Sequence, residues 1–148
     1  QSGGYLVINP TEALVSIDIN SGSATTETNV ERTALATNLE AAEEISRQIK
    51  IRDLSGLIII DFIDMLENRN NRIIENTLKQ NLSKDRAKIQ VGQISSFGLL
   101  EMSRQRIGPN VYEADFIDCH SCHASGKIRS LESNSLKVLR QIQEKSNK

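Results

Sequence analysis

Three polar residues have the types and the spacing of a metal-dependent hydrolytic site. Asp18 and Asn20 lie two residues apart in the run SIDIN, and Asp61 ends the apolar run LIIID. Residues two apart in a strand point to the same face, so Asp18 and Asn20 would share a polar face. Mg²⁺ prefers oxygen ligands, and it can polarise a phosphoryl oxygen and generate a hydroxide for in-line attack. The chemistry indicated is hydrolysis of nucleic acid.

Two neighbouring strands and the helix between them would have to position these residues. Both aspartates end β-rich runs, and the segment between them has apolar residues at steps of three and four, which predicts a helix. A strand, helix, strand order favours parallel neighbours whose carboxyl ends meet at one sheet edge. Asp18 and Asp61 would meet there with one Mg²⁺ between them, and Asn20 would orient Asp61 or the attacking water.

The same acids also have a purely structural interpretation. Asp18 and Asp61 could cap strand ends or pair with Arg and Lys of adjacent loops, without any metal. Asp64 is a competing ligand in the same run, but strand alternation turns its side chain away from Asp61. It would join the site only where the strand has already ended.

The remaining pattern predicts an α/β fold with a mixed sheet and crossover helices, followed by a knuckle and a C-terminal helix. A hairpin turns at residues 9–12, and Thr28 and Glu31 have the spacing of a helical capping box. The strand ending near Asp61 reads as buried on both faces. A second helix follows, with an apolar stripe, then two strands joined around 96–98, an irregular stretch over 108–118 and a final helix. The stripe of the second helix is Ile73, Ile74, Leu78 and Leu82.

Cys119 and Cys122 have the CxxC spacing that lets two thiolates reach one Zn²⁺. A structural zinc needs four ligands, and no second cysteine pair exists in the sequence. The missing ligands would be His120 and His123 or the same knuckle of another protomer. The ring of His120 would point away from the metal, which favours two chains sharing one Zn²⁺ as a dimer clasp. A redox CxxC or two inert thiols remain as alternatives.

Arg104 and Arg106 lie two apart in the run MSRQRI, so they would share a strand face and could grip RNA phosphate. Arg69 and Arg72, at the start of the second helix, are weaker candidates for the same role. An exposed Arg pair is more commonly solvated surface or a partner of acids.

Composition limits the class of protein. The 148 residues carry a net charge of -1 and only 3% aromatic residues, so base stacking is no dominant theme. No apolar run is long enough to cross a membrane and no signal segment is present, so we expect a cytoplasmic protein, peripheral at the inner membrane face at most. Because the sequence does not begin with Met, we expect a piece of a larger protein.

Several long motifs, in order and with matching spacing, resemble one known family. SGGYLVINPTEALVSIDINSG, TNLEAAEEISRQIKIRDLSGLIIIDFIDM and FGLLEMSRQR, followed by the CxxC knuckle, closely resemble the catalytic core of the ribonuclease E/G endoribonucleases. The resemblance implies a DNase I-like subdomain over 1–115, a zinc-link knuckle over 116–128 and the first helix of a small dimerisation domain over 129–148. One departure is His120, where the family usually has Pro.

The resemblance also implies an activity and its residues. It implies Mg²⁺-assisted hydrolysis of single-stranded, A/U-rich RNA to products with a 5′-phosphate, in rRNA processing and mRNA decay. Asp18 and Asp61 match the family's metal-binding aspartates, and Asn20 matches its site amide. Cys119 and Cys122 match the cysteines that join two protomers through one Zn²⁺.

The resemblance extends to assembly. It implies a homodimer or homotetramer, with RNA-decay partners bound through regions outside this sequence. A barrel-shaped RNA-binding domain and a 5′-monophosphate sensor would precede the segment, so we expect it alone to bind metal weakly and to cleave RNA poorly. The rival hypothesis is a non-catalytic, zinc-clasped dimerisation module of a larger RNA-binding protein.

Overall fold

The computed structural model describes residues 3–22, 30–122 and 125–146. The chain divides into two compact units, residues 1–115 and residues 116–148. The first contains a sheet with its helices, and the second contains the CxxC segment and the last helix. The predicted capping box at Thr28 lies outside the described residues.

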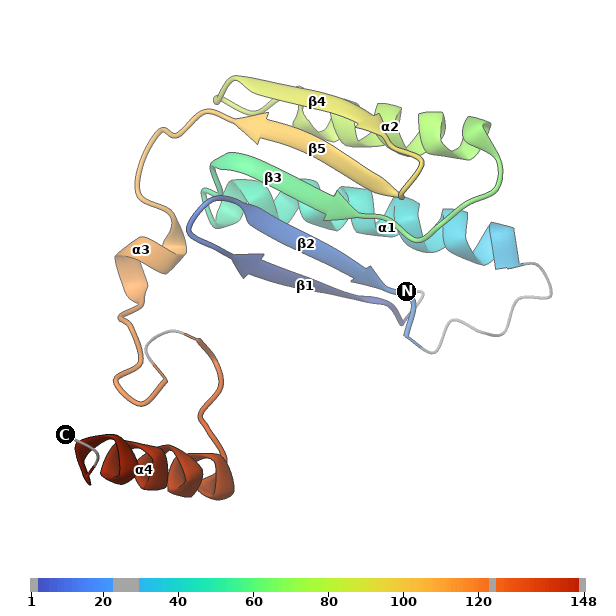
Figure 1. Ribbon diagram of the computed structural model, residues 1–148. Helices are drawn as coiled ribbons and strands as arrows, with labels where there is room; N and C mark the ends of the chain where they lie inside the picture. The colour runs from blue at the N-terminus through green and yellow to red at the C-terminus, as the bar shows by residue number, and fades with distance from the viewer. Residues whose placement is uncertain (1–2, 23–29, 123–124, 147–148) are drawn as a thin grey trace. The chain divides into compact units, whose positions relative to one another are not determined.

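The first unit is built on a five-stranded mixed sheet in the order β1-β2-β3-β5-β4 (Figure 1). Only β2 and β3 are parallel neighbours, and the other three pairs are antiparallel. The predicted mixed α/β sheet and its parallel crossover are confirmed. The strands are β1 (Tyr5–Pro10), β2 (Val15–Asn20), β3 (Gly56–Asp61), β4 (Ile89–Ile94) and β5 (Leu99–Arg104).

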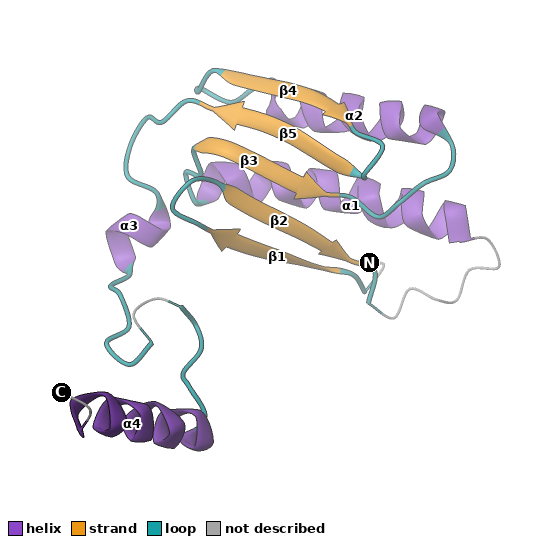
Figure 2. Cartoon of the chain, viewed as in Figure 1, coloured by secondary structure: helices purple, strands orange, loops and turns teal. Residues whose placement is uncertain are grey.

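The long helices α1 (Val30–Ile51) and α2 (Asn68–Leu82) lie on the same face of this sheet (Figure 2). The core forms between them and the sheet, where Ile58 and Ile60 of β3 have no exposed surface. Leu57, on the other face of β3, is 44% exposed. The expectation that β3 is buried on both faces is therefore wrong, because the apolar composition of a strand does not show which of its faces α1 and α2 cover.

The connections differ in detail from the sequence prediction. The hairpin turn lies at residues 11–14, where the Thr11 amide donates to the Leu14 carbonyl at 2.8 Å. The stretch predicted as irregular contains a short helix, α3 (Val111–Asp115). Ile73, assigned to the apolar stripe of α2, is 45% exposed. Successive side chains on a helix are rotated by about 100°, so Ile73 points out of the core while the next residue, Ile74, is buried in it.

In the second unit, α4 (Leu131–Ser146) is the predicted final helix. None of its described residues is buried. Its large apolar side chains are between 52% and 84% exposed; they are Leu131, Leu136, Val138, Leu139 and Ile142.

Across the described residues, none of the helices combines the length and the apolar character that crossing a membrane requires.

Candidate active site

The two aspartates singled out by the sequence lie side by side. Asp18 and Asp61 are register partners in the parallel β2–β3 pair, and neighbouring strands lie about 4.8 Å apart. Ile17 and Ile60, which precede them, are buried toward the helices, whereas both aspartates are exposed on the open face. The residues thus share both an edge and a face of the sheet, as one shared cation requires.

Asn20 belongs to the same cluster but has a different partner from the one expected. Its Nδ2 donates to Asp18 Oδ2 at 2.9 Å. The sequence predicted that Asn20 orients Asp61 or the attacking water; in the structure its side-chain amide orients Asp18 instead of Asp61. Both side chains come from one strand face and are two residues apart, so the amide fixes the nearer carboxylate. The hydrogen bond of the Asn20 amide therefore constrains the carboxylate of Asp18 and not that of Asp61.

Asp61 has an electrostatic environment that disfavours its charge. Partial burial of its carboxylate, together with the negative charges of Asp18 and Asp64, raises the pKa of Asp61 above its usual value of 3.8. The charge of Asp64 therefore affects the pKa of Asp61, although strand alternation predicted that the Asp64 side chain would point away from it. The strand ends at Asp61, so alternation no longer applies three residues later.

The β4–β5 turn comes close to both of these carboxylates. A Cβ added at Gly98 would lie 2.9 Å from Asp64 Oδ1 and 3.9 Å from Asp61 Oδ1. The Phe62 amide donates to the Gly98 carbonyl at 3.1 Å, which joins the turn to the end of β3. Gly98 also has a positive φ of 76°, which glycine adopts at little cost. Only glycine fits this close approach without displacing an acid.

A buried amide on α1 fixes the segment that carries these acids. Asn38 has no exposed surface. Its Nδ2 donates to the Ile63 carbonyl at 2.8 Å, and its Oδ1 accepts from the Ile63 amide at 3.0 Å. Sequence reasoning missed this residue, although a polar side chain between the buried Ala34 and Ala41 was a signal for it. Two hydrogen bonds to the backbone of one residue, Ile63, hold the chain between Asp61 and Asp64.

Glu31 at the start of α1 supports the same connection. Its carboxylate accepts from the backbone amides of Leu66 and Glu67 at 3.0 and 3.2 Å, and from Asn70 Nδ2 at 2.7 Å. The Leu66 hydrogen bond makes the largest contribution to lowering the pKa of Glu31. The charged acid thus ties the loop before α2 to α1.

The two carboxylates are suitable ligands for Mg²⁺, but they are too few to fill its coordination shell. Asp18 and Asp61 offer hard oxygen ligands, and their mutual repulsion is relieved by a cation between them. Within residues 3–22, 30–122 and 125–146, no three Asp, Glu, His or Cys side chains are placed to hold a metal ion. Mg²⁺ commonly completes its shell with water and substrate phosphate when one or two carboxylates bind it.

Arg104 does not have the exposed position predicted for an RNA contact. Its side chain is 2% exposed, with Nη1 2.7 Å from Asp53 Oδ1 and Nε 3.0 Å from Asp85 Oδ2. Nη1 also donates to the Leu54 carbonyl at 3.0 Å. The prediction of phosphate binding is wrong for Arg104, because this residue ends β5 on the helix-covered face and its guanidinium is occupied by two carboxylates.

The other arginines remain on the surface. The side chain of Arg106 is 63% exposed and pairs with Glu113. Arg106 follows the end of β5, so it does not form a two-residue strand pair with Arg104. Arg69 is 79% exposed and pairs with Glu67, and Arg72 is exposed. Phosphate binding by Arg106, Arg69 and Arg72 stays a prediction.

The CxxC segment places its two thiols near each other. Cys119 and Cys122 are free cysteines. Hydrogen bonds from the backbone amides of Cys122 and Ser121, and then from the Cys122 side chain, lower the pKa of Cys119 below 9.0. His120 is exposed, and His123 lies outside the described residues. Amide groups directed at a sulfur favour the thiolate, which is the form that binds metal.

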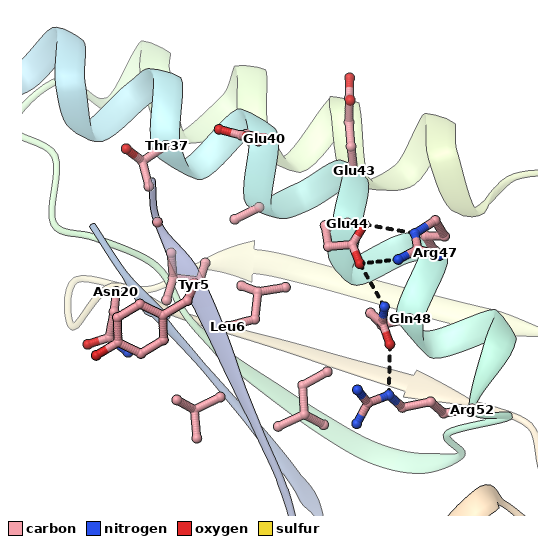
Figure 3. A pocket seen from close by; sticks show the side chains of 15 residues that line it. Tyr5, Leu6, Asn20, Thr37, Glu40, Glu43, Glu44, Arg47, Gln48 and Arg52 are labelled. Atoms are coloured by element: carbon pink, nitrogen blue, oxygen red, sulfur yellow. Dashed lines mark hydrogen bonds and ion pairs between the residues drawn. The ribbon is translucent and has the colours of Figure 1, made fainter. Parts of the chain in front are cut away.

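A separate cavity of about 810 Å³ lies between β1 and α1 (Figure 3). On its wall, Glu44 accepts from Arg47 and from Gln48, and Gln48 in turn accepts from Arg52 at 2.7 Å. The hydrogen bonds from Arg47 and then Gln48 lower the pKa of Glu44 to about 2. The cavity meets the aspartate cluster only at Asn20, and Glu44 and Arg47 of its wall pair with each other.

The raised pKa of Asp61 predicts a pH-dependent stability. Between pH 3.8 and the raised value the folded chain binds more protons than the unfolded chain, so this group lowers the free energy of unfolding as pH rises. Without divalent metal, Asp61→Asn should match the wild type near pH 4 and exceed it at pH 7 by up to about 1 kcal/mol, because the pair is exposed. Thermal unfolding of both chains across this range measures the difference. A pH-independent difference would contradict the electrostatic origin.

Comparisons with known proteins show which family this sequence is similar to. The model of the ribonuclease E/G family matches residues 1–107. Ribonuclease E of Escherichia coli strain K12 is 53% identical over 145 residues, which cover 98% of this chain and 14% of that protein. Ribonuclease E of Haemophilus influenzae is 52% identical, covering 98% and 16%. Ribonuclease G of Escherichia coli strain K12 is 40% identical over 142 residues, covering 96% and 29%.

The chain thus spans less than a third of the length of each of these relatives. Asp18, Asn20 and Asp61, with the elements that position them, all lie inside the segment that the family model matches. The match extends over well over half of the 148 residues and agrees with the resemblance in its motifs. This chain belongs to the ribonuclease E/G family.

Proposed function

We propose that this chain is the catalytic segment of a Mg²⁺-dependent endoribonuclease. Its substrate is single-stranded, A/U-rich RNA, its products carry a 5′-phosphate, and its roles are rRNA processing and mRNA decay. The observation that supports this most strongly is the register pairing of Asp18 with Asp61 on the open face. Family membership supports the same reaction class, because relatives named ribonuclease E and ribonuclease G match almost the whole chain.

Each residue of the cluster has a distinct role in this proposal. Asp18 and Asp61 hold the metal through one or more carboxylate oxygens each, and Asn20 keeps Asp18 in place through its 2.9 Å hydrogen bond. Mg²⁺, when bound, supplies Lewis-acid polarisation of the scissile phosphate and a more acidic water. Asp61 faces the open side of the sheet, where an RNA strand can approach. The nearby negative charge of Asp64 strengthens the attraction of this edge for a cation.

Removal of the metal tests the reaction class. The intact protein should cleave a single-stranded A/U-rich oligonucleotide with Mg²⁺ present, stop in excess chelator, and recover when Mg²⁺ is restored. Ca²⁺ is a matched control, because it binds oxygen ligands with longer and less regular geometry. The downstream product should carry a 5′-phosphate, as measured by mass spectrometry. Undiminished cleavage in chelator, or a 5′-hydroxyl product, would refute the proposed reaction.

We further propose that Cys119 and Cys122 bind half of a Zn²⁺ site that two protomers complete with four thiolates. The lowered pKa of Cys119 supports thiolate formation. Each chain then contributes to a homodimer, and pairs of dimers can form a homotetramer. The exposed apolar residues of α4 offer surface that such an assembly would cover. Single-stranded RNA and other RNA-decay proteins are the remaining partners proposed for the intact protein.

Zinc stoichiometry distinguishes a shared site from a site within one chain. The intact protein should contain one Zn²⁺ per two chains, and Cys119→Ser should lower both the zinc content and the molar mass in solution. His120→Ala should leave both values unchanged, because a shared four-thiolate site does not use that ring. Elemental analysis with light scattering measures these quantities. One Zn²⁺ per chain would show that histidines complete the site instead.

A further inference from the structure

A second cavity adjoins the aspartate cluster. It has a volume of about 290 Å³ and lies where the β3–α2 connection, the start of α2 and the β4–β5 turn come together at one end of the sheet (Figure 1). This volume is near the lower limit for small-molecule pockets, about 300 Å³. The cavity therefore has room for one flat ring system. Its polar lining comes from Asp64, Asn68, Asn71, Ser95 and Ser96, and Gly98 forms part of its wall.

Gly98 lies between this cavity and the aspartate cluster. A Cβ at Gly98 would contact Asp64 Oδ1 at 2.9 Å and lie 3.9 Å from Asp61 Oδ1. Asp64 lines the cavity, and its charge raises the pKa of Asp61. A group that enters the cavity would therefore be a close neighbour of a phosphate bound at Asp18 and Asp61.

The polar groups of the cavity are available to a ligand. Within the part of the chain that the structure describes, no hydrogen bond engages the side chains of Asp64, Asn68, Asn71 or Ser96. Asn68 and Asn71 each offer an amide that can donate and accept, whereas the Asp64 carboxylate can only accept. The negative charge of Asp64 disfavours a phosphate in this cavity. A neutral ligand that donates hydrogen bonds fits the lining better.

An exposed aromatic residue lies in the turn that forms part of the cavity wall. Phe97 is 81% exposed and lies in the β4–β5 turn between two lining residues, Ser96 and Gly98. The turn has a defined shape, because the Phe97 amide donates to Ser95 Oγ at 3.2 Å and the Gly98 amide donates to the Ser95 carbonyl at 3.1 Å. Unpaired bases stack on exposed aromatic rings in single-stranded RNA complexes.

We propose that this cavity binds one unpaired nucleobase of the RNA, next to the bond that is cut, and that it favours adenine or cytosine over uracil. The inference rests on the proposed function, because it takes RNA to be the substrate at Asp18 and Asp61. Phe97 stacks on the base, Asp64 accepts a hydrogen bond from its exocyclic amino group, and the amide of Asn68 or Asn71 donates to an adjacent ring nitrogen. Uracil presents a carbonyl oxygen where the other two bases present the amino group, so it would face Asp64 unfavourably.

A pair of substrates that differ only in cytosine or uracil tests the hydrogen bond to Asp64. Each position near the cut is varied singly between the two bases, which have the same size. At one position we expect the intact protein to prefer cytosine by about tenfold in kcat/KM, the usual scale of a good base contact. In Asp64→Asn this preference should disappear, because an amide can donate to the uracil carbonyl. Asp64→Asn also changes the pKa of Asp61, but this change affects cleavage of the cytosine and uracil substrates equally. The ratio of the two kcat/KM values therefore reports the base contact alone.

Variants of Phe97 test the stacking contact. Phe97→Ala should raise KM for every base by about tenfold, within the range measured for loss of one stacking contact, whereas Phe97→Trp should restore binding. Ile51→Ala is the matched control: Ile51 is 63% exposed at the end of α1, away from the cavity, and its loss should leave KM unchanged.

A binding experiment separates failure of this inference from failure of the proposed function. RNA containing 5-iodocytidine is crosslinked by light to the intact Asp61→Asn variant, and mass spectrometry locates the adduct. We expect it at Phe97 and expect Phe97→Ala to abolish it. Cleavage that depends on Asp61, with no adduct at Phe97 and a cytosine-to-uracil ratio unchanged by Asp64→Asn, would overturn the base pocket alone. Absence of Asp61-dependent cleavage of any RNA would overturn the proposed function instead.

Discussion

Asp61→Asn in the intact protein is expected to reduce RNA cleavage by at least about 100-fold, the loss seen when one electrostatic group of a transition-state site is removed. The carboxylate faces its register partner Asp18. An amide has the same shape but no charge, so it binds Mg²⁺ more weakly and no longer balances its charge. Initial rates on a single-stranded A/U-rich oligonucleotide measure the effect.

Asp115→Asn is the matched control for this variant. It makes the same chemical change at an exposed acid of α3, at the other end of the sheet from Asp61 (Figure 1). We expect wild-type rates from it. Circular dichroism and molar mass should be the same for both variants, because neither side chain is buried in the core. Cleavage by Asp61→Asn within tenfold of the wild-type rate would exclude Asp61 as a metal ligand.

Arg104→Met is expected to lower the free energy of unfolding of the chain by about 3–5 kcal/mol, the cost of leaving a buried charge unpaired. The side chains of Arg104 and Asp85 are each 2% exposed. Burial would raise the pKa of Asp85, but hydrogen bonds from Arg104 and the Ala87 amide together lower it. Without Arg104, the Asp85 carboxylate would remain buried but would lose its main hydrogen-bond partner. Urea unfolding followed by circular dichroism measures the change.

Two further variants identify the cause of this loss. Arg106→Met removes an arginine whose side chain is 63% exposed and should change stability by no more than about 1 kcal/mol. Arg104→Met combined with Asp85→Leu should recover part of the stability, because no unpaired charge then remains at Asp85. Equal effects of Arg104→Met and Arg106→Met would show that the buried ion pair contributes little.

The strands, the crossover and the pair of acids could be predicted from local sequence patterns. The apolar run before Asp61 and the alternation around Asp18 define strands whose ends a parallel crossover brings to one edge. This information is local, because it depends on periodicities of two and of three to four residues. The register pairing of Asp18 with Asp61 agrees with it.

Which face of each strand is covered depends on how the helices pack on the sheet. Strand alternation placed Arg104 on one face of β5 but could not show that the helices lie over that face. Asp53 and Asp85 approach Arg104 from connections 51 and 19 residues away in the sequence. No local pattern of charges predicts such contacts, because they depend on how α1 and α2 pack on the sheet.

The same reason explains the residues around the aspartates that sequence reasoning missed. Asn38 reaches Ile63 across 25 residues, and Gly98 brings the β4–β5 turn against Asp61 and Asp64. Each contact joins segments that lie far apart in the chain, and it forms only when packing closes the distance. The sequence therefore determined which groups can do the chemistry, while packing of the helices and the turn decided what surrounds them.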